Sequence, residues 1–185
     1  MVRAALVFAT VFAIVAPATA HTGSYTPPET SKPAVTPPMK VRVIDARTFA
    51  DTQTGETFRL FAVDVCSIEQ TANLDGQSWP CGVISTAWLV QQTLGQWVIC
   101  NRVHTQPGLT LARCATSRQP DLAASMIREG MAVTVHDPDI TTPAEYNQLD
   151  AEARHGFRGL WRSQFLMPWE YRSQRKLRPE GDPLK

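Results

Sequence analysis

The chain has 185 residues, which is long enough for one domain with its own hydrophobic core. It holds 18 Lys and Arg against 17 Asp and Glu, so its formal net charge is +1. Domains that bind nucleic acid over a broad surface usually carry a clear excess of positive charge, and this composition argues against that class.

The N-terminal residues predict an exported protein. Residues 1–20 combine an early positive charge, an apolar run and the small-residue sequence Ala18-Thr19-Ala20, which is the pattern of a cleaved signal peptide. The apolar run is too short to span a bilayer, so we expect no integral membrane span after cleavage and a periplasmic or secreted location. Residues 21–38, rich in Pro and Thr, predict an extended linker. We expect a folded domain over residues 39–172 and a basic flexible tail over residues 173–185.

The first half of the folded domain predicts two strands, a loop and a helix. Val41–Phe49 and Phe58–Val63 alternate apolar and polar residues, and the turn-like segment Asp51–Gly55 separates them. Residues 66–80 contain Gly and Pro and predict an irregular loop. Gly82–Leu94 has apolar residues at helical spacing and ends before a glycine, which predicts a helix.

The middle of the domain predicts a hairpin, a helix and a short strand. Trp97–Val103 and Thr110–Ala115 are rich in apolar residues and flank a Pro-Gly pair, as two hairpin strands would. Asp121 is suited to cap a helix over Leu122–Glu129, which a glycine would close. Met131–Val135 predicts a short strand.

The last elements complete a small mixed domain. Thr142-Pro143 predicts the start of a helix that runs to about His155, because Pro is favoured in the first turn. Gly159-Leu160-Trp161 would end this helix, and Phe165–Tyr171 predicts an apolar closing segment. Five strands with about three helices indicate an α+β, mainly β fold, and we predict a five-stranded Greek-key barrel of the OB type.

The chain has 4 cysteines, at positions 66, 81, 100 and 114. An even number in an exported protein favours two disulfides, for which three pairings exist. Zinc binding is the alternative, although the Cys-x-x-Cys pair typical of such sites is missing. We predict the sequence-local pairs Cys66–Cys81 and Cys100–Cys114, the second because its two cysteines fall on neighbouring strands.

Short motifs follow one another along the chain in an order and spacing that are specific as a set. They are Arg59-Leu60 to Asp64, Cys66, Gln70, Trp79-Pro80-Cys81-Gly82, Val98-Ile99-Cys100, Ala112-Arg113-Cys114, Asp121-Leu122, Ile127-Arg128-Glu129-Gly130, Glu152-Ala153-Arg154 and Gly159-Leu160-Trp161. This pattern, over about residues 41–172, resembles the staphylococcal-nuclease (thermonuclease-like) family. It is most similar to the exported, cysteine-bearing bacterial subgroup.

The resemblance implies that part of a metal and phosphate site is retained. In active family members the second strand supplies an Arg that grips phosphate and an Asp that binds metal, and Arg59 and Asp64 match these two positions. The first strand ends in Asp-Gly-Asp-Thr, whose second Asp binds calcium. Here the first of these acids is retained as Asp45, whereas Arg47 stands at the ligand position.

Two further positions depart from the family pattern. Ser67 stands where the presumed general base is Glu, and Leu109 stands where a second Arg binds phosphate. Removing a general base lowers a rate by about 10²–10⁴-fold, and removing an electrostatic donor by about 10²–10³-fold. Glu69 is a candidate replacement base and Arg113 a candidate replacement cation, although both are more simply interpreted as surface residues.

These substitutions predict that Arg47 acts on Asp64 in place of a metal. A fixed guanidinium repels a divalent cation at the ligand position, and we hypothesise that Arg47 pairs with Asp64 as a structural counter-charge. The sequence therefore predicts no cofactor, with Ca²⁺ expected only if the site is still active.

We expect a nuclease homologue with a degenerate site, catalytically impaired or inactive. It would act as a monomeric accessory that binds a polymer, either a glycan or a nucleic acid, or a protein partner. Near-neutral charge favours a glycan or protein over DNA, and the resemblance implies a role in exopolysaccharide (succinoglycan) biosynthesis. The alternative is an active metal-dependent endonuclease, a phosphodiester hydrolase with a rearranged site.

Overall fold

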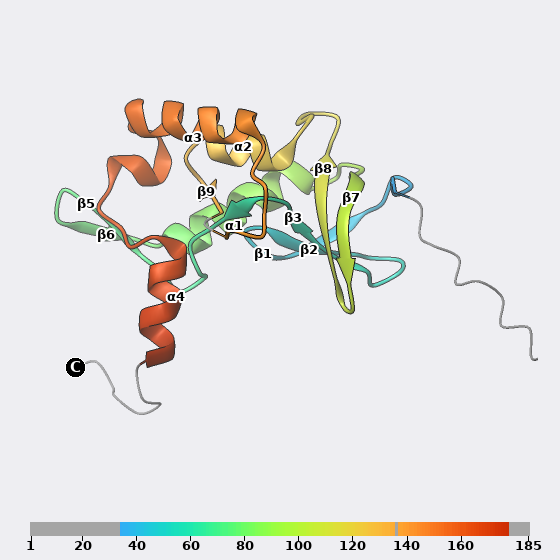
Figure 1. The fold of residues 1–185 in the computed structure, drawn as a ribbon, viewed down its shortest axis with the longest axis horizontal. Helices are drawn as coiled ribbons and strands as arrows, with labels where there is room; N and C mark the ends of the chain where they lie inside the picture. The colour runs from blue at the N-terminus through green and yellow to red at the C-terminus, as the bar shows by residue number, and fades with distance from the viewer. Residues whose placement is uncertain (1–33, 136, 178–185) are drawn as a thin grey trace, which may run out of the picture. The chain divides into compact units, whose positions relative to one another are not determined.

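The computed structural model describes residues 34–135 and 137–177; the predicted signal peptide, most of the linker and residues 178–185 lie outside them. A five-stranded sheet in the order β1-β2-β3-β8-β7 forms the centre of the fold (Figure 1). Neighbouring strands are antiparallel, except that β3 and β8 are parallel. The strands are β1 (Val41–Asp45), β2 (Thr48–Asp51), β3 (Thr57–Leu60), β7 (Ile99–Gln106) and β8 (Leu109–Ala115).

The segment that precedes β1 closes this sheet into a barrel. Met39 and Val98 exchange two backbone hydrogen bonds of 2.9 Å, and Val35 forms an antiparallel bridge with Asn101. The last residues of the linker predicted over 21–38 are therefore part of the fold, because Val35 and Thr36 pair with residues of β7. The predicted α+β class with an OB-type barrel is confirmed.

The second predicted strand is interrupted just before its carboxylate. β3 ends at Leu60, and Ala62 has a φ of 58°, in the left-handed region that non-glycine residues rarely adopt. The chain turns there, and β4 (Val63–Asp64) pairs antiparallel with β9 (Val133–Thr134) instead of continuing β3. This turn places Asp64 at the rim of the barrel.

Three helices form where the sequence predicts them. They are α1 (Cys81–Thr93), α2 (Leu122–Arg128) and α3 (Ala144–His155). The Asp121 carboxylate accepts a hydrogen bond of 3.1 Å from the Ala124 N–H and so caps α2 as predicted. α2 and α3 pack side by side (Figure 1). The segment predicted to end α3 forms a separate 3₁₀ turn, η1 (Gly159–Arg162).

The C-terminal part of the domain differs from its prediction. A fourth helix, α4 (Pro168–Leu177), spans the boundary between the expected apolar closing segment and the expected tail. Pro168 stands at its first position, Glu170 lies in its first turn, and Arg175 and Lys176 lie in its last turn. Each of these residues is favoured at that end of a helix. The described residues thus hold four α-helices instead of about three, and the basic tail begins as ordered helix.

The irregular loop predicted over residues 66–80 contains a β-hairpin. β5 (Ala72–Leu74) pairs antiparallel with β6 (Gln77–Trp79). Asp75 and Gly76 join the two strands with φ values of 50° and 84°, as a type I′ two-residue turn requires.

Both predicted disulfides are present. Cys100 and Cys114 lie directly opposite each other on β7 and β8, with Cα atoms 4.1 Å apart. Cys66 and Cys81, with Cα atoms 5.9 Å apart, tie the segment after β4 to the first residue of α1. The described residues leave no free thiol, so the alternative of zinc binding by these cysteines is wrong.

Two hydrophobic clusters hold the elements together. The larger one fills the barrel and the space beneath the helices, with Phe49, Phe58 and Leu89 among its fully buried members. The smaller one surrounds the Cys66–Cys81 disulfide and includes the half-buried Trp169 of α4. α4 is therefore packed onto the domain near the segment that follows Asp64.

Candidate functional site

The Asp64 carboxylate is the centre of the candidate site, and its side chain is only 2% exposed. Arg172 of α4 donates two hydrogen bonds to it, from Nη1 to Oδ1 at 3.0 Å and from Nη2 to Oδ2 at 2.6 Å. Arg47 Nη1 lies 3.0 Å from Oδ1, and the Val65 N–H donates to the same oxygen at 3.0 Å. A bidentate Arg–carboxylate pair is among the strongest ionic contacts in proteins. Both oxygens of Asp64 are engaged by guanidinium groups.

Arg47 enters the site from the turn between β1 and β2. The Asp45 carboxylate accepts a hydrogen bond of 2.9 Å from the Arg47 backbone N–H, so Asp45 shapes this turn. Arg47 Nη1 also donates to the Val63 carbonyl at 3.0 Å. Burial lowers the pKa of Arg47 and Asp64 opposes this effect, yet the guanidinium stays charged because arginine does not deprotonate in proteins. The predicted contact between Arg47 and Asp64 is present.

Arg59 of β3 is the third cation of the site. The strand register places it opposite Thr48 of β2, and its Nε donates to the Thr48 Oγ1 at 3.2 Å. Within residues 34–135 and 137–177, no carboxylate lies within salt-bridge distance of Arg59. Most of its donor groups are therefore available to an anionic ligand.

The three arginines line two adjoining cavities. The first, of about 280 Å³, also holds Asp64 and Asp137, and its remaining wall is largely apolar and includes Leu60, Leu109, Leu111, Val135, Ile140 and Trp169. The second, of about 370 Å³, holds Asp45 and Ser67 beside the same arginines. The structure thus brings together most of the residues singled out in the sequence, namely Asp45, Arg47, Arg59, Asp64, Ser67 and Leu109.

Ser67 is placed at the site by backbone contacts. Its N–H donates to the Gln70 side-chain carbonyl at 3.2 Å, and its carbonyl lies so close to Gly82 that a Cβ added there would be 1.9 Å from the oxygen. The loop is therefore packed tightly against the start of α1. A serine hydroxyl does not take up a proton near neutral pH, so Ser67 does not replace the carboxylate of a general base.

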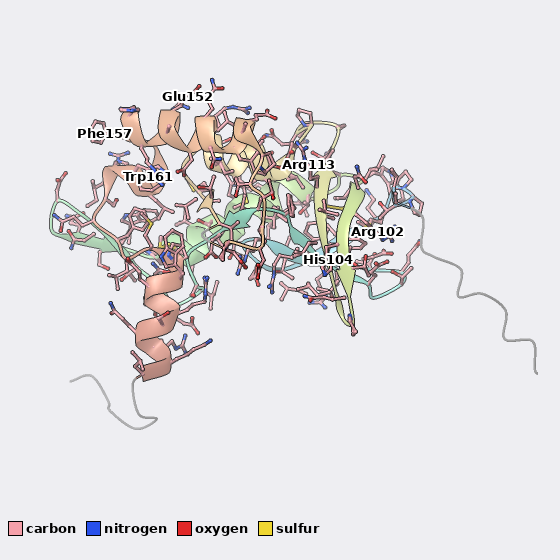
Figure 2. The ribbon with its side chains drawn as sticks, viewed as in Figure 1. Arg102, His104, Arg113, Glu152, Phe157 and Trp161 are labelled. Atoms are coloured by element: carbon pink, nitrogen blue, oxygen red, sulfur yellow. A yellow bond between two sulfur atoms is a disulfide. The ribbon has the colours of Figure 1, made fainter. Side chains whose placement is uncertain are left out.

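The two candidate replacements do not line either cavity. Glu69 Oε2 lies 2.8 Å from Arg175 Nη1 of α4, and this exposed hydrogen bond lowers the pKa of Glu69. Arg113 pairs with Asp121 at 3.0 Å and lies over the Tyr146 ring, on the side of the molecule where β8 meets α2 and α3 (Figure 2). Both residues behave as the surface residues of the simpler interpretation.

The residues of the site do not fit the calcium ion that the resemblance implies. Calcium takes six to eight oxygen ligands, mostly from carboxylates and carbonyls. Among the described residues there is no group of three or more His, Cys, Asp or Glu that could hold a metal ion. Arg47 occupies the second ligand position, and a cation at Asp64 would have to displace two guanidinium groups.

Sequence reasoning missed two residues of the site. Arg172 lies 108 positions from Asp64 along the chain, directly after the predicted apolar closing segment and in a basic stretch that is as simply interpreted as a solvated tail. The helix signals at the ends of α4 could have indicated an amphipathic element there, but not its partner. Asp137 is exposed, lies between β9 and α3, and reaches the first cavity only through the fold.

A five-stranded barrel closed by the segment before β1, with helices packed on it, defines an OB-type fold. The sequence profile of the staphylococcal nuclease homologue family matches residues 57–163, and the chain belongs to this family. The match includes Arg59, Asp64, Ser67 and Leu109, whereas Arg47 and Arg172 lie outside it. A comparison with curated proteins found no match.

Proposed function

We propose that this protein is a catalytically impaired member of its family that binds an anionic polymer without metal and without hydrolysing it. The observation that carries the proposal is the state of Asp64, which is held between Arg47 and Arg172 while Arg59 in the same cavity has no carboxylate partner among the described residues. The two arginines on Asp64 supply the positive charge that a metal ion would supply in an active relative.

The chemistry of the cavity favours an oxyanion as the ligand group. Arg presents a planar fork of N–H donors that matches phosphate and carboxylate groups. Arg47, Arg59 and Arg172 outnumber the two carboxylates of the first cavity, so a bound anion meets net positive charge there. Hydrolysis is disfavoured, because Ser67 stands at the position of the base and Leu109 at the position of the second phosphate arginine.

An acidic exopolysaccharide is the polymer that we favour. The formal net charge of +1 provides no broad basic surface for a nucleic acid, whereas a local arginine cluster is sufficient for spaced carboxylates. OB-type barrels bind oligosaccharides as well as oligonucleotides. This supports the accessory role in exopolysaccharide (succinoglycan) biosynthesis that the resemblance implies.

We also propose that the protein acts outside the cytoplasm, in the periplasm or after secretion. Two disulfides support this location, because such bonds persist mainly in oxidising compartments. The N-terminal pattern of the sequence supports it as well. No helix within the part of the chain that the structure describes is long and apolar enough to cross a membrane.

The test is a binding titration of the oxidised mature protein with a uronic-acid oligosaccharide in the presence of a chelator. We expect binding that Arg59→Ala weakens by about 10–100-fold, because a hydrogen bond to a charged group contributes about 1.5–3 kcal/mol. Arg113→Ala is the matched control, since Arg113 is an arginine that pairs with Asp121 away from the cavities, and it should bind as the wild type does.

Parallel assays on single-stranded DNA and RNA, with calcium, magnesium or chelator, decide between binding and catalysis. Metal-dependent cleavage that Arg59→Ala abolishes would overturn the proposal in favour of an active nuclease, with Asp137 as the next residue to substitute. Tighter binding of DNA than of the oligosaccharide would change the polymer class. If substituting the cavity arginines left binding unchanged, the two cavities would not be the binding site.

A further inference from the structure

Helix α1 carries an apolar stripe on its exposed side. Val83, Ala87, Val90 and Leu94 recur at spacings of four, three and four residues, which places them in one line along the helix. Val83 is 46% exposed, Val90 39% and Leu94, the residue that ends the helix, 72%. The opposite side of α1 packs into the core through Trp88 and Leu89. The stripe is thus distinct from the face that holds the helix in the fold.

The stripe lacks the charges that normally solvate an exposed helix. α1 has the sequence CGVISTAWLVQQT, with no acidic residue in its first turn, no basic residue in its last turn and none between. An outward-facing helix side usually carries charged and polar residues. An exposed line of apolar residues on a helix without charge marks a surface that is covered by another molecule or segment.

The stripe continues into an apolar groove. Three residues after Leu94, Trp97 is 56% exposed, and Ile99 at the start of β7 is 42% exposed. Both line a groove of about 640 Å³ together with Pro38, Ala115, Thr116 and Ser117. Lys40 Nζ lies 4.4 Å from the centre of the Trp97 ring and donates to the Gly95 carbonyl at 2.9 Å, so the ring is fixed beside the helix end.

We propose that this surface, the α1 stripe with the Trp97 groove, is the interface of a homodimer in which α1 packs antiparallel against α1 of a second copy. Antiparallel packing around a two-fold axis brings the same stripe onto itself, and a helix without charges meets its own copy without repulsion. The end of each stripe, at Leu94 and Trp97, would then lie beside the start of the partner's stripe. This inference does not depend on the proposed function.

The size of the surface fits a second copy. The six apolar residues of the surface, partly exposed, offer on the order of 100 Å² each, and their sum of about 600 Å² is at the lower limit of the roughly 600–1,000 Å² per partner of a standard interface. Interfaces of this kind are apolar at the centre and are formed most often by two-fold related copies.

The test is sedimentation velocity of the full oxidised protein from about 1 to 100 µM. We expect a dimer that Val83→Glu and Val90→Glu each convert to a monomer, with a shift in the dissociation constant of 100-fold or more. The matched control is Val103→Glu on β7, because Val103 has the same 46% exposure as Val83 but belongs neither to the α1 stripe nor to the lining of the Trp97 groove. Circular dichroism melts of all variants verify that each substitution leaves the fold intact.

Three outcomes would overturn the proposal. The first is a monomeric wild type at every concentration. The second is a dimer that Val103→Glu dissociates as strongly as Val90→Glu does. The third is a monomer in which hydrogen exchange shows the α1 amides to be protected by residues 21–33, which would assign the stripe to a segment of the same chain.

Discussion

The pairing of Asp64 with two arginines explains how a buried acid persists at this rim. A carboxylate that is 2% exposed needs compensating charge and hydrogen bonds, and in this structure Arg47, Arg172 and the Val65 N–H provide them. In an active relative a metal ion would contribute that charge. Under the proposed function, Arg47 and Arg172 are the source of the positive charge, and Asp64 has a structural role.

This account predicts a strong energetic coupling between Arg47 and Asp64. Arg47→Ala should lower the free energy of unfolding by about 2–3 kcal/mol, because it removes one of two partners of a buried charge. In the Asp64→Asn background the same substitution should cost less, by about 1–3 kcal/mol, as expected for residues in direct contact. Urea denaturation of the four proteins measures the cycle, and additivity within 0.5 kcal/mol would contradict the structural role.

The contact between Arg47 and Asp64 could be predicted from sequence, whereas that between Arg172 and Asp64 could not. Arg47 and Asp64 match two metal-ligand positions of the family that the sequence resembles, so their side chains were expected to meet. Arg172 belongs to a helix outside the family match, and nothing local in the sequence indicates which acid it meets. A long-range ion pair depends on how two elements pack against each other. Hydrophobic periodicity and helix-capping residues report only local structure, so they do not predict such a pair.

At the scale of elements, α4 forms two unequal ion pairs with the rest of the domain. Arg172 and Arg175 lie on the same helix, one turn apart. Arg172 meets a buried acid and is 37% exposed, whereas Arg175 and its partner Glu69 are both more than half exposed, at 59% and 53%. Exposed ion pairs contribute little because solvent screens them.

We therefore expect Arg172→Ala and Arg175→Ala to differ sharply. Arg172→Ala should lower the free energy of unfolding by about 2–3 kcal/mol and loosen α4, because Asp64 loses its bidentate partner. Arg175→Ala should change it by less than about 1 kcal/mol. Urea denaturation with hydrogen exchange of α4 measures both effects, and equal losses in the two variants would show that α4 is not held through Asp64.

Two elements that sequence reasoning missed, the β5–β6 hairpin and α4, do carry local sequence signals, but these signals are weak beside the irregular or apolar character of the surrounding segments. The hairpin of β5 and β6 turns at Asp75-Gly76, a strong two-residue turn signal, but the strands on each side are only three residues long. α4 begins with Pro168, which was interpreted as part of an apolar closing segment. In both cases short elements are stabilised by packing around the Cys66–Cys81 disulfide, which propensity does not report.

At the scale of the whole molecule, one disulfide lies within the barrel and the other lies outside it. Cys100–Cys114 links two strands that are already paired along their length, in the part of the sheet closed by Met39. Cys66–Cys81 links the loop after β4, which carries Ser67 and is called the cavity loop below, to α1. The general barrel could be predicted because strand patterns and turn residues are local, but its closure by residues 35–39 could not, since a Pro- and Thr-rich segment resembles a linker.

This difference predicts that removing the two disulfides has similar effects on stability and different effects on the site. Cys66→Ala with Cys81→Ala, and Cys100→Ala with Cys114→Ala, each open a loop of about 15 residues, so each should cost about 3 kcal/mol in the chain-entropy account. Only the first pair of substitutions releases Ser67, which lines the second cavity and contacts Gly82 beside Cys81.

We therefore expect the Cys66/Cys81 variant, under conditions where it is folded, to bind the uronic-acid oligosaccharide at least several-fold more weakly than the Cys100/Cys114 variant does. Urea denaturation gives the stability of each variant, and titration at low urea gives the affinity. The Cys100/Cys114 variant is the control, because it has a comparable loss of stability with the cavity loop still attached to α1. Equal affinities in the two variants would mean that the arginines hold the cavity without the loop, and that the disulfide next to the site serves stability alone.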